Sequence, residues 1–204
     1  MQNHSKIKVW DPLVRVFHWT LVGSFLIAYI TEEDFLSLHV WAGYILLAAI
    51  AVRLIWGIIG TRYARFSDFV TSPLTALRYV KDSLSLKAKR YIGHNPAGGW
   101  MIVIMLTSLV ATGATGLLLY GAGEHAGPLA GWFAAESEYW EKALEEIHEF
   151  LANFTMFLVV IHLAGVLLES ILHKENLVAA MINGEKVRGD KISDENARPQ
   201  EFSR

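Results

Sequence analysis

The feature that most constrains this chain is an apolar stretch at residues 148–172 that carries two histidines, His148 and His162. About 20 apolar residues cross a bilayer as a helix, so this stretch predicts a membrane span. The two histidines are 14 residues apart, close to four helical turns, so both rings lie on one helix face, about 21 Å apart along the axis. A histidine inside a membrane span is costly to leave unpaired and indicates a functional site.

Three further apolar stretches predict a bundle of four membrane helices. Before the stretch at 148–172, we expect spans at about residues 14–31, 36–60 and 98–120. The chain has 204 residues, of which 53% are hydrophobic, and this suits a small helical membrane protein. The expected fold class is therefore all-α, an integral membrane four-helix bundle that forms a single domain over residues 1–204.

The connection at residues 61–95 is basic and predicts a cytoplasmic amphipathic surface helix. Ser72 followed by Pro73 is a typical helix start. Apolar side chains then recur at a spacing of three or four residues, at Leu74, Leu77, Val80 and Leu84. Such a helix is expected to lie on the membrane surface.

Composition limits the kinds of site and the processing that the chain can have. Cysteine is absent, which excludes disulfides, thiolate metal sites, iron–sulfur clusters and covalently attached c-type haem. The first span has no cleavage signal before it, so we expect an uncleaved anchor. The chain after Lys174 is polar, with residues 187–204 as a tail, and we expect part of it to be disordered. No nucleic-acid partner is expected.

Positive charge is distributed unevenly between the two sides of the predicted bundle. Three Lys or Arg residues precede or begin the first span, seven lie at 61–95 and six follow residue 172, whereas the opposite side has only Lys142. The positive-inside rule then places both termini in the cytoplasm. We expect a multi-pass protein of the bacterial inner membrane, with an acidic outer side that includes the connection at 121–147.

Depth in the membrane sorts four histidines into two pairs, each joining two different helices. His39 and His148 lie near the outer ends of their spans, and His18 and His162 lie nearer the cytoplasmic side. The alternative is that each is a helix-end histidine in contact with lipid headgroups. That alternative fits His162 poorly, because its ring lies well inside an apolar run. We therefore expect each pair to bind a ligand.

The residues around the pairs favour haem over a bare metal ion. Zinc or copper would need three or four converging donors, and no Asp, Glu or Cys accompanies either pair at its depth. Haem needs two axial nitrogens and a flat apolar slot. Gly43 and Gly165 share helix faces with two of the histidines and are candidate positions for a porphyrin edge, although glycine also serves helix packing alone.

Two other polar residues are candidates for contact with the cofactor. Arg53 follows His39 by 14 residues, so it lies on the same face, and a haem propionate is a plausible partner. The alternative is that Arg53 extends to the cytoplasmic interface. His94, in the run GHNP, is expected to belong to the entry of the third span; the alternative is a role at a quinone headgroup or a propionate.

Taken together, these motifs resemble the four-helix bacterial dihaem b-type cytochromes, which include cytochrome b561 and the cytochrome b subunits of nickel–iron hydrogenases. The resemblance covers residues 7–186 and rests on VWDPLVRVFHW, LHVWAGYILLAAIAVRLIWGIIGTRYARF, GHNPAGG and HEFLANFTMFLVVIHLAGVLLESILHKENLVAAMINGEK. It implies two b haems, with iron ligated by His18, His39, His148 and His162.

Such a protein is expected to transfer single electrons in a respiratory chain, between the quinone pool and a periplasmic redox protein. That protein would be a basic c-type cytochrome or a hydrogenase-like subunit. An enzymatic alternative is a superoxide:quinone oxidoreductase, but the acidic outer side would repel superoxide. A structural alternative is a haem-free membrane anchor subunit.

Overall fold

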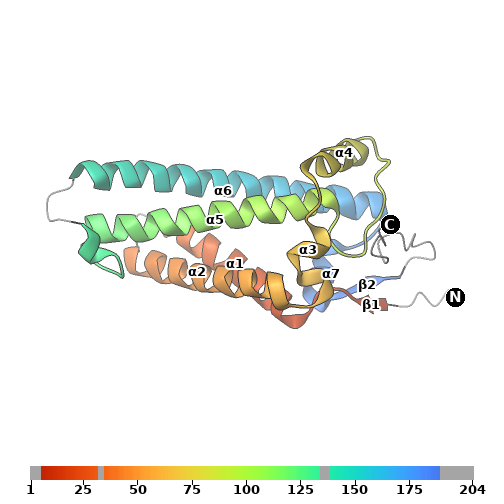
Figure 1. The fold of residues 1–204 in the computed structure, drawn as a ribbon, viewed down its shortest axis with the longest axis horizontal. Coiled ribbons are helices and arrows are strands. Elements are labelled where there is room, and N and C mark those ends of the chain that lie inside the picture. Colours follow the sequence, from red (N-terminus) through yellow and green to blue (C-terminus); the bar gives the residue numbers. More distant parts are fainter. Residues whose placement is uncertain (1–5, 32–34, 134–137, 189–204) are drawn as a thin grey trace, which may run out of the picture.

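The computed structural model describes residues 6–31, 35–133 and 138–188. Four long helices form the bundle, as two pairs that contact each other through α2 and α5 (Figure 1). The pairs are α1 (Pro12–Ile30) with α2 (Leu36–Ile59), and α5 (Pro96–Gly123) with α6 (Glu138–His173). All four helices are long and apolar enough to cross a membrane, which confirms the predicted four-helix membrane bundle.

The shorter elements gather mainly at one end of the bundle (Figure 1). That end holds β1 (Lys6–Lys8), the 3-10 helix η1 (Arg62–Ala64), α3 (Phe66–Phe69), α4 (Pro73–Leu84), α7 (Leu177–Asn183) and β2 (Glu185–Val187). The other end carries the 3-10 helix η2 (Ala130–Trp132). The described parts of the basic segments therefore share one end, opposite the acidic connection between α5 and α6.

Three of the helices begin with the same local device, a polar cap followed by proline. Asp11, Ser72 and Asn95 accept a hydrogen bond from the backbone three residues ahead, at the starts of α1, α4 and α5. Proline follows each of them, where it costs no hydrogen bond because the first helical N–H groups have no partner within the helix. These starts are set by local sequence.

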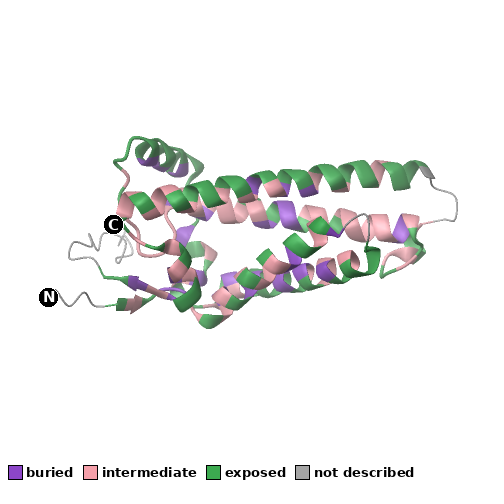
Figure 2. Cartoon of the chain, turned by 180° about the vertical axis from the view of Figure 1, so that it is seen from behind, coloured by how far each residue is buried: buried purple, intermediate pink, exposed green. Residues whose placement is uncertain are grey.

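The outer surface of the bundle is apolar. Large side chains such as Ile58, Phe150 and Leu167 are exposed, and Figure 2 shows exposed residues along the outward sides of the long helices. Helices in lipid gain little from burying such side chains, because lipid tails are themselves apolar. This surface is therefore the one that lipid covers.

Helix α6 begins ten residues before the predicted span at 148–172. The segment that precedes His148 is rich in Glu, Lys, Ala and Leu, which are strong helix formers. The helix therefore continues past the end of the apolar stretch instead of ending at it. Our prediction treated this segment as part of a loop and was wrong there.

The polar chain after Lys174 is more ordered than predicted. It forms α7 and then β2, which pairs antiparallel with β1 so that Lys6 lies opposite Val187. Backbone N–H groups of Val9 and Trp10 also donate to the Gly184 carbonyl oxygen, at 2.8 and 3.2 Å. This two-stranded sheet is a small departure from an all-α fold. The rest of the predicted tail, residues 189–204, lies outside the described residues.

Candidate functional site

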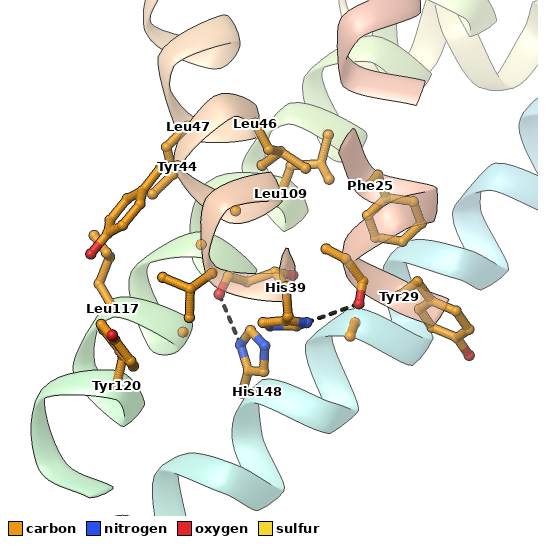
Figure 3. A pocket seen from close by; sticks show the side chains of 17 residues that line it. Phe25, Tyr29, His39, Tyr44, Leu46, Leu47, Leu109, Leu117, Tyr120 and His148 are labelled. Atoms are coloured by element: carbon orange, nitrogen blue, oxygen red, sulfur yellow. Dashed lines mark hydrogen bonds between the residues drawn. The ribbon is translucent and has the colours of Figure 1, made fainter. Parts of the chain in front are cut away.

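The structure brings His39 on α2 and His148 on α6 together at the end of the bundle away from β1 and β2. The centres of the two imidazole rings are 6.0 Å apart and the ring planes are inclined at 76°. Figure 3 shows both rings pointing into one pocket between the helices. We refer to these two residues and the pocket around them as the outer site.

Backbone carbonyl groups hold both outer rings in one tautomer. Nδ1 of His39 donates to the Ala28 carbonyl oxygen at 2.8 Å, and Nδ1 of His148 donates to the Thr112 carbonyl oxygen at 3.0 Å (Figure 3). A carbonyl can only accept, so Nδ1 carries the proton on each ring and Nε2 keeps its lone pair. Histidines that ligate metals are oriented in this way. The outer site therefore presents two free Nε2 atoms.

The distance between the two rings suits a single metal ion between them. Two metal–nitrogen bonds of about 2 Å each, together with the half-widths of two imidazole rings, add up to roughly 6 Å. No group of three or more His, Cys, Asp or Glu residues within the described ranges could hold a metal ion. The donor set thus fits a cofactor that brings its own equatorial ligands, as haem does.

The outer pocket is lined mainly by apolar and small residues. Gly43 is part of the lining, and a Cβ placed there would meet no protein atom within 4 Å. Gly116 also lines the pocket, but a Cβ there would lie 2.9 Å from Cε1 of His148. Gly116 therefore allows α5 to approach the His148 ring, whereas Gly43 leaves space at the pocket wall.

The second pair, His18 on α1 and His162 on α6, lies toward the opposite end. No aromatic contact joins these two rings among the described residues. Nδ1 of His18 is buried and has no hydrogen-bond partner in the described chain. Gly165 follows His162 by one turn, and a Cβ placed there would meet no protein atom within 4 Å. We refer to this region as the inner site.

Arg53 is the most unusual residue of the inner site. Its side chain is only 4% exposed, and its Nη1 has no hydrogen-bond partner in the described chain. The guanidinium lies over the Phe66 ring at 4.5 Å and over the Phe17 ring at 5.3 Å. A side chain buried to this extent does not reach the interface, which argues against the alternative in which Arg53 extends to it. A buried cation without an acceptor favours an anionic ligand.

His94 also belongs to the inner site, although we gave it a minor role from sequence. Its ring packs against Trp10 and Phe69, with ring centres 4.5 Å apart in both cases. Nδ1 of His94 is buried without a partner among the described residues. Burial and the nearby Arg53 lower the pKa of His94, and Lys186 adds to this effect.

His18 and His162 also contribute to the lowered pKa of His94. With its pKa lowered, His94 is neutral at physiological pH. The signal that could have found it was in the sequence: His94 lies between glycine and the Asn-Pro pair that begins α5.

A cluster of hydroxyl groups lies between the two sites along α6. Thr155 is fully buried, and it lies seven residues from both His148 and His162. Its hydroxyl is 2.7 Å from that of Ser108 and donates to the Leu151 carbonyl oxygen at 2.8 Å. Small hydroxyl-bearing residues allow membrane helices to approach closely, so this cluster fixes α5 against α6 between the two sites.

The end of the bundle beyond the outer site is acidic in the described residues. Glu141, Glu145, Glu146 and Glu149 are exposed along the first half of α6, and Glu124 is exposed after α5. None of these five carboxylates forms an ion pair in the described part of the chain. Five more acidic residues belong to the outer side expected from sequence; Glu32, Glu33, Asp34 and Glu136 lie outside the described residues, as does the side chain of Glu138.

Sequence reasoning missed the groups that orient the outer rings. The acceptors are the carbonyl oxygens of Ala28 and Thr112, with the Thr115 hydroxyl 3.1 Å from Nδ1 of His148. The run ATGATG, which contains both threonines, was a possible signal because it places small and hydroxyl-bearing residues on one helix. Ala28 gives no signal, since any residue supplies a carbonyl group.

Several known proteins resemble this chain over most of its length. A sequence model of the family described as prokaryotic cytochrome b561 matches residues 9–184. A relative in Rhizobium leguminosarum bv. viciae, named "Probable Ni/Fe-hydrogenase B-type cytochrome subunit", is 25% identical over 93% of this chain and 92% of its own length. Relatives with the same name are 23% identical in Rhodobacter capsulatus, over 94% and 86% of the two chains, and 24% identical in Cupriavidus necator, over 86% and 85%. No solved structure gives a significant match.

Proposed function

The chain belongs to the prokaryotic cytochrome b561 family and is thus a membrane-bound b-type cytochrome that transfers electrons; we propose that it binds two haems. We further propose that it passes single electrons between the quinone pool and a redox protein docked at its acidic end. The observation that carries this proposal is the geometry of the outer site. Two histidines from different helices face one apolar pocket there, and each is oriented by a backbone carbonyl group.

In this proposal, His39 and His148 hold one haem and His18 and His162 hold the other. A haem with two histidine ligands supplies one-electron chemistry when bound. With both axial positions taken by protein, neither site would leave a position for an exogenous ligand. The hydrogen bonds from Nδ1 to the Ala28 and Thr112 carbonyl oxygens would make each outer histidine a stronger donor and fix its ring orientation.

At the inner site, Arg53 would offset the negative charge of a haem propionate. Its buried Nη1 needs an acceptor, and the described chain supplies no ion pair to it. A charge-assisted hydrogen bond from a guanidinium to a carboxylate is among the stronger polar interactions in proteins. Gly43 and Gly165, which have free space beside them, would allow porphyrin edges to approach their helices.

The membrane orientation follows from the distribution of charge. The described basic segments lie at the end that holds β1 and β2 (Figure 1), so the positive-inside rule would place that end in the cytoplasm of a bacterial inner membrane. The two sites would then lie at different depths, with the outer site toward the periplasm. Electrons would cross the membrane between them and exchange with quinone within the bilayer.

The partner at the periplasmic end would carry a basic docking surface. Glu141, Glu145 and Glu146 are exposed there and unpaired in the described chain, and opposite charges speed the association of redox partners. The relatives reported above carry the name "Probable Ni/Fe-hydrogenase B-type cytochrome subunit", so a hydrogenase-like subunit is one candidate. A basic c-type cytochrome is the other.

The direct test is the haem content and redox behaviour of the purified protein. We expect two non-covalently bound haems per chain, low-spin spectra in both oxidation states and two components in a redox titration. Reduction of both haems by a quinol in proteoliposomes would support the quinone step. A preparation with native-like helix content but no haem after expression with ample haem supply would contradict the proposal and favour a haem-free anchor.

Docking at the acidic end has its own test. Electron transfer to a basic cytochrome should slow markedly as ionic strength rises to ~0.15 M, where the Debye length is ~8 Å. Replacing Glu141 and Glu145 by Lys should weaken this dependence, whereas Asp82→Lys, an exposed acid on α4, should leave it unchanged. A rate that responds to neither salt nor the double replacement would mean that these acids have no docking role.

A further inference from the structure

The amphipathic helix α4 is packed against the bundle by its small and polar residues and not by its apolar ones. Ala76, Tyr79 and Ser83 are buried. The apolar stripe predicted from sequence is exposed instead, with exposed fractions between 43% and 71% for Leu74, Leu77, Val80 and Leu84. Helix α4 therefore presents four large apolar side chains to its surroundings, which requires an explanation.

The position of α4 is fixed by hydrogen bonds to a carboxylate on α6. The hydroxyl groups of Tyr79 and Ser83 both donate to Glu169, each at 2.9 Å. Burial and the neighbouring Glu169 raise the pKa of Tyr79 above its ordinary value, so its hydroxyl remains a donor at physiological pH. Glu169 lies four residues before the end of α6. Helix α4 is thus held beside the last turns of a membrane span (Figure 1).

Exposed apolar residues of α6 lie at the same level as α4. Leu167 and Ile171 are two residues before and after Glu169, so they lie on the opposite side of α6 from it, and both are exposed. At about 100° per residue, the stripe of Leu77, Val80 and Leu84 is centred roughly a third of a turn from the buried face of α4. One side of α4 is therefore apolar at the level where α6 leaves the bilayer.

Four cations lie on α4 or within five residues after its end. Arg78 and Lys81 are on α4, and Lys87 and Lys89 follow it; all four are exposed, and none forms an ion pair in the described part of the chain. Asp82 is the one acid between Pro73 and Lys89. Long basic side chains can bury their methylene groups in apolar surroundings and extend their charge to the headgroups.

We propose that this face of α4 is a binding site for anionic phospholipids of the surrounding membrane. The leucine stripe lies among acyl chains, and Arg78, Lys81 and the two lysines after the helix contact headgroup phosphates. An apolar face bordered by unpaired cations is the pattern of helices that lie in a membrane interface. Basic clusters of this kind next to a membrane span select anionic lipids.

Site-specific labels can test where the stripe lies. The chain has no cysteine, so Leu77→Cys and Leu84→Cys each provide a unique attachment point for an environment-sensitive fluorophore, and Asp82→Cys is the matched control on the same helix. In nanodiscs with the full chain, we expect labels at 77 and 84 to be quenched by lipid-borne spin labels and the label at 82 by an aqueous quencher. Aqueous quenching of all three would overturn the proposal.

A third pattern would identify a different occupant. Labels at 77 and 84 that are shielded from both quenchers would mean that protein covers the stripe, and this too would overturn the proposal. Circular dichroism and an unchanged haem content would verify that each labelled variant is folded.

Lipid selectivity tests the role of the cations. Spin-labelled phosphatidylglycerol should associate with the protein more strongly than spin-labelled phosphatidylcholine, by roughly fivefold for each cation that reaches a headgroup. The double variant Arg78→Gln and Lys81→Gln should lose most of this preference. The matched control, Lys8→Gln and Arg188→Gln, changes charge equally at two other exposed positions and should keep it. If wild type, the double variant and the control preferred phosphatidylglycerol to the same extent, the proposal would be overturned.

Discussion

The outer and inner sites differ in how their polar atoms are satisfied. At the outer site, Nδ1 of both His39 and His148 donates to a backbone carbonyl oxygen of a neighbouring helix. At the inner site, by contrast, His18, Arg53 and His94 each have a buried nitrogen without a partner in the described chain. The outer rings are therefore oriented by the protein itself, whereas the inner site leaves buried polar atoms that the proposed haem would satisfy.

This difference predicts that the two sites respond differently to loss of their ligand. Buried polar atoms without partners destabilise the folded state, and a ligand that binds only the folded state stabilises it. The inner end should therefore gain more stability from its haem than the outer end does. Substitutions at the two sites test this difference.

The largest effects are expected from the histidines. His39→Ala or His148→Ala should each remove about one haem per chain and leave the inner haem bound, because one ligand cannot hold the iron in a low-spin state alone. His18→Ala and His162→Ala should remove the inner haem and also lower the thermal midpoint further than the outer variants do. Haem assay and calorimetry measure both. Two low-spin haems in His39→Ala would refute the proposed pairing.

Adding bulk at the two candidate glycines should have a large but partial effect. A Cβ added at Gly43 or Gly165 would have no protein atom within 4 Å. The protein therefore leaves room beside both positions, and a leucine there would occupy space proposed for a porphyrin edge. Gly43→Leu should lower outer haem occupancy, and Gly165→Leu should lower inner haem occupancy. Gly131→Leu, at an equally open position in η2, is the control. Full occupancy in Gly165→Leu would mean that this glycine faces lipid.

A moderate effect is expected from Arg53. Arg53→Leu should lower the midpoint potential of the inner haem by tens of millivolts, because loss of a nearby buried cation disfavours the added electron. The outer haem should be unaffected, and Arg53→Lys should retain part of the effect. Spectroscopic redox titration separates the two haems. If the midpoint potential of the inner haem were the same in wild type, Arg53→Leu and Arg53→Lys, Arg53 would be excluded as a charge partner of that haem.

The smallest effect is expected from Asp11, which joins α1 to the end of α2 beside the inner site. Burial raises the pKa of Asp11, but hydrogen bonds from Thr61, Val14 and Trp56 outweigh this and lower it overall. A lowered carboxyl pKa stabilises the fold above the unfolded value near 3.8, and this contribution is lost as pH falls through the lower folded value.

Asp11→Ala should therefore reduce stability by about 1 kcal/mol at neutral pH, the usual cost of losing a helix cap. Its difference from wild type should shrink as the pH is lowered below the unfolded value. Thermal unfolding followed by inner haem absorbance at several pH values measures this. A difference that does not depend on pH would show that the carboxylate charge is unimportant.

The bundle and the proximity of His39 to His148 could be predicted from the sequence because both follow from periodicity and depth. Four apolar stretches fix four helices, and spacing along them brings His39 and His148 to one level, where the structure shows their ring centres 6.0 Å apart. What could not be predicted depends on contacts between distant segments. The packing of His94 between Trp10 and Phe69 joins three separate parts of the chain. The Gly-His-Asn-Pro pattern marks His94 but does not show which residues its ring contacts.

The extent of the ordered C-terminal segment was also beyond local patterns. Residues around Gly184 are polar and resemble a loop by composition. Their order comes from pairing with β1 and from the hydrogen bonds that Val9 and Trp10 donate to Gly184. Backbone pairing of this kind needs a partner strand, and its partner is more than 170 residues away in sequence.

The pairing of β1 with β2 has a consequence for the order of events during synthesis. β1 leaves the ribosome before all four long helices, and β2 emerges after them. The carbonyl groups of Met181 and Ile182, which accept hydrogen bonds from Trp19 and Arg15 of α1, are equally late. Domains generally fold as translation proceeds. The hydrogen bonds between α1 and these late segments can therefore form only after most of the chain has been made. The contacts at the inner end are therefore the last to form, so the haem proposed for that end would have the longest time to enter.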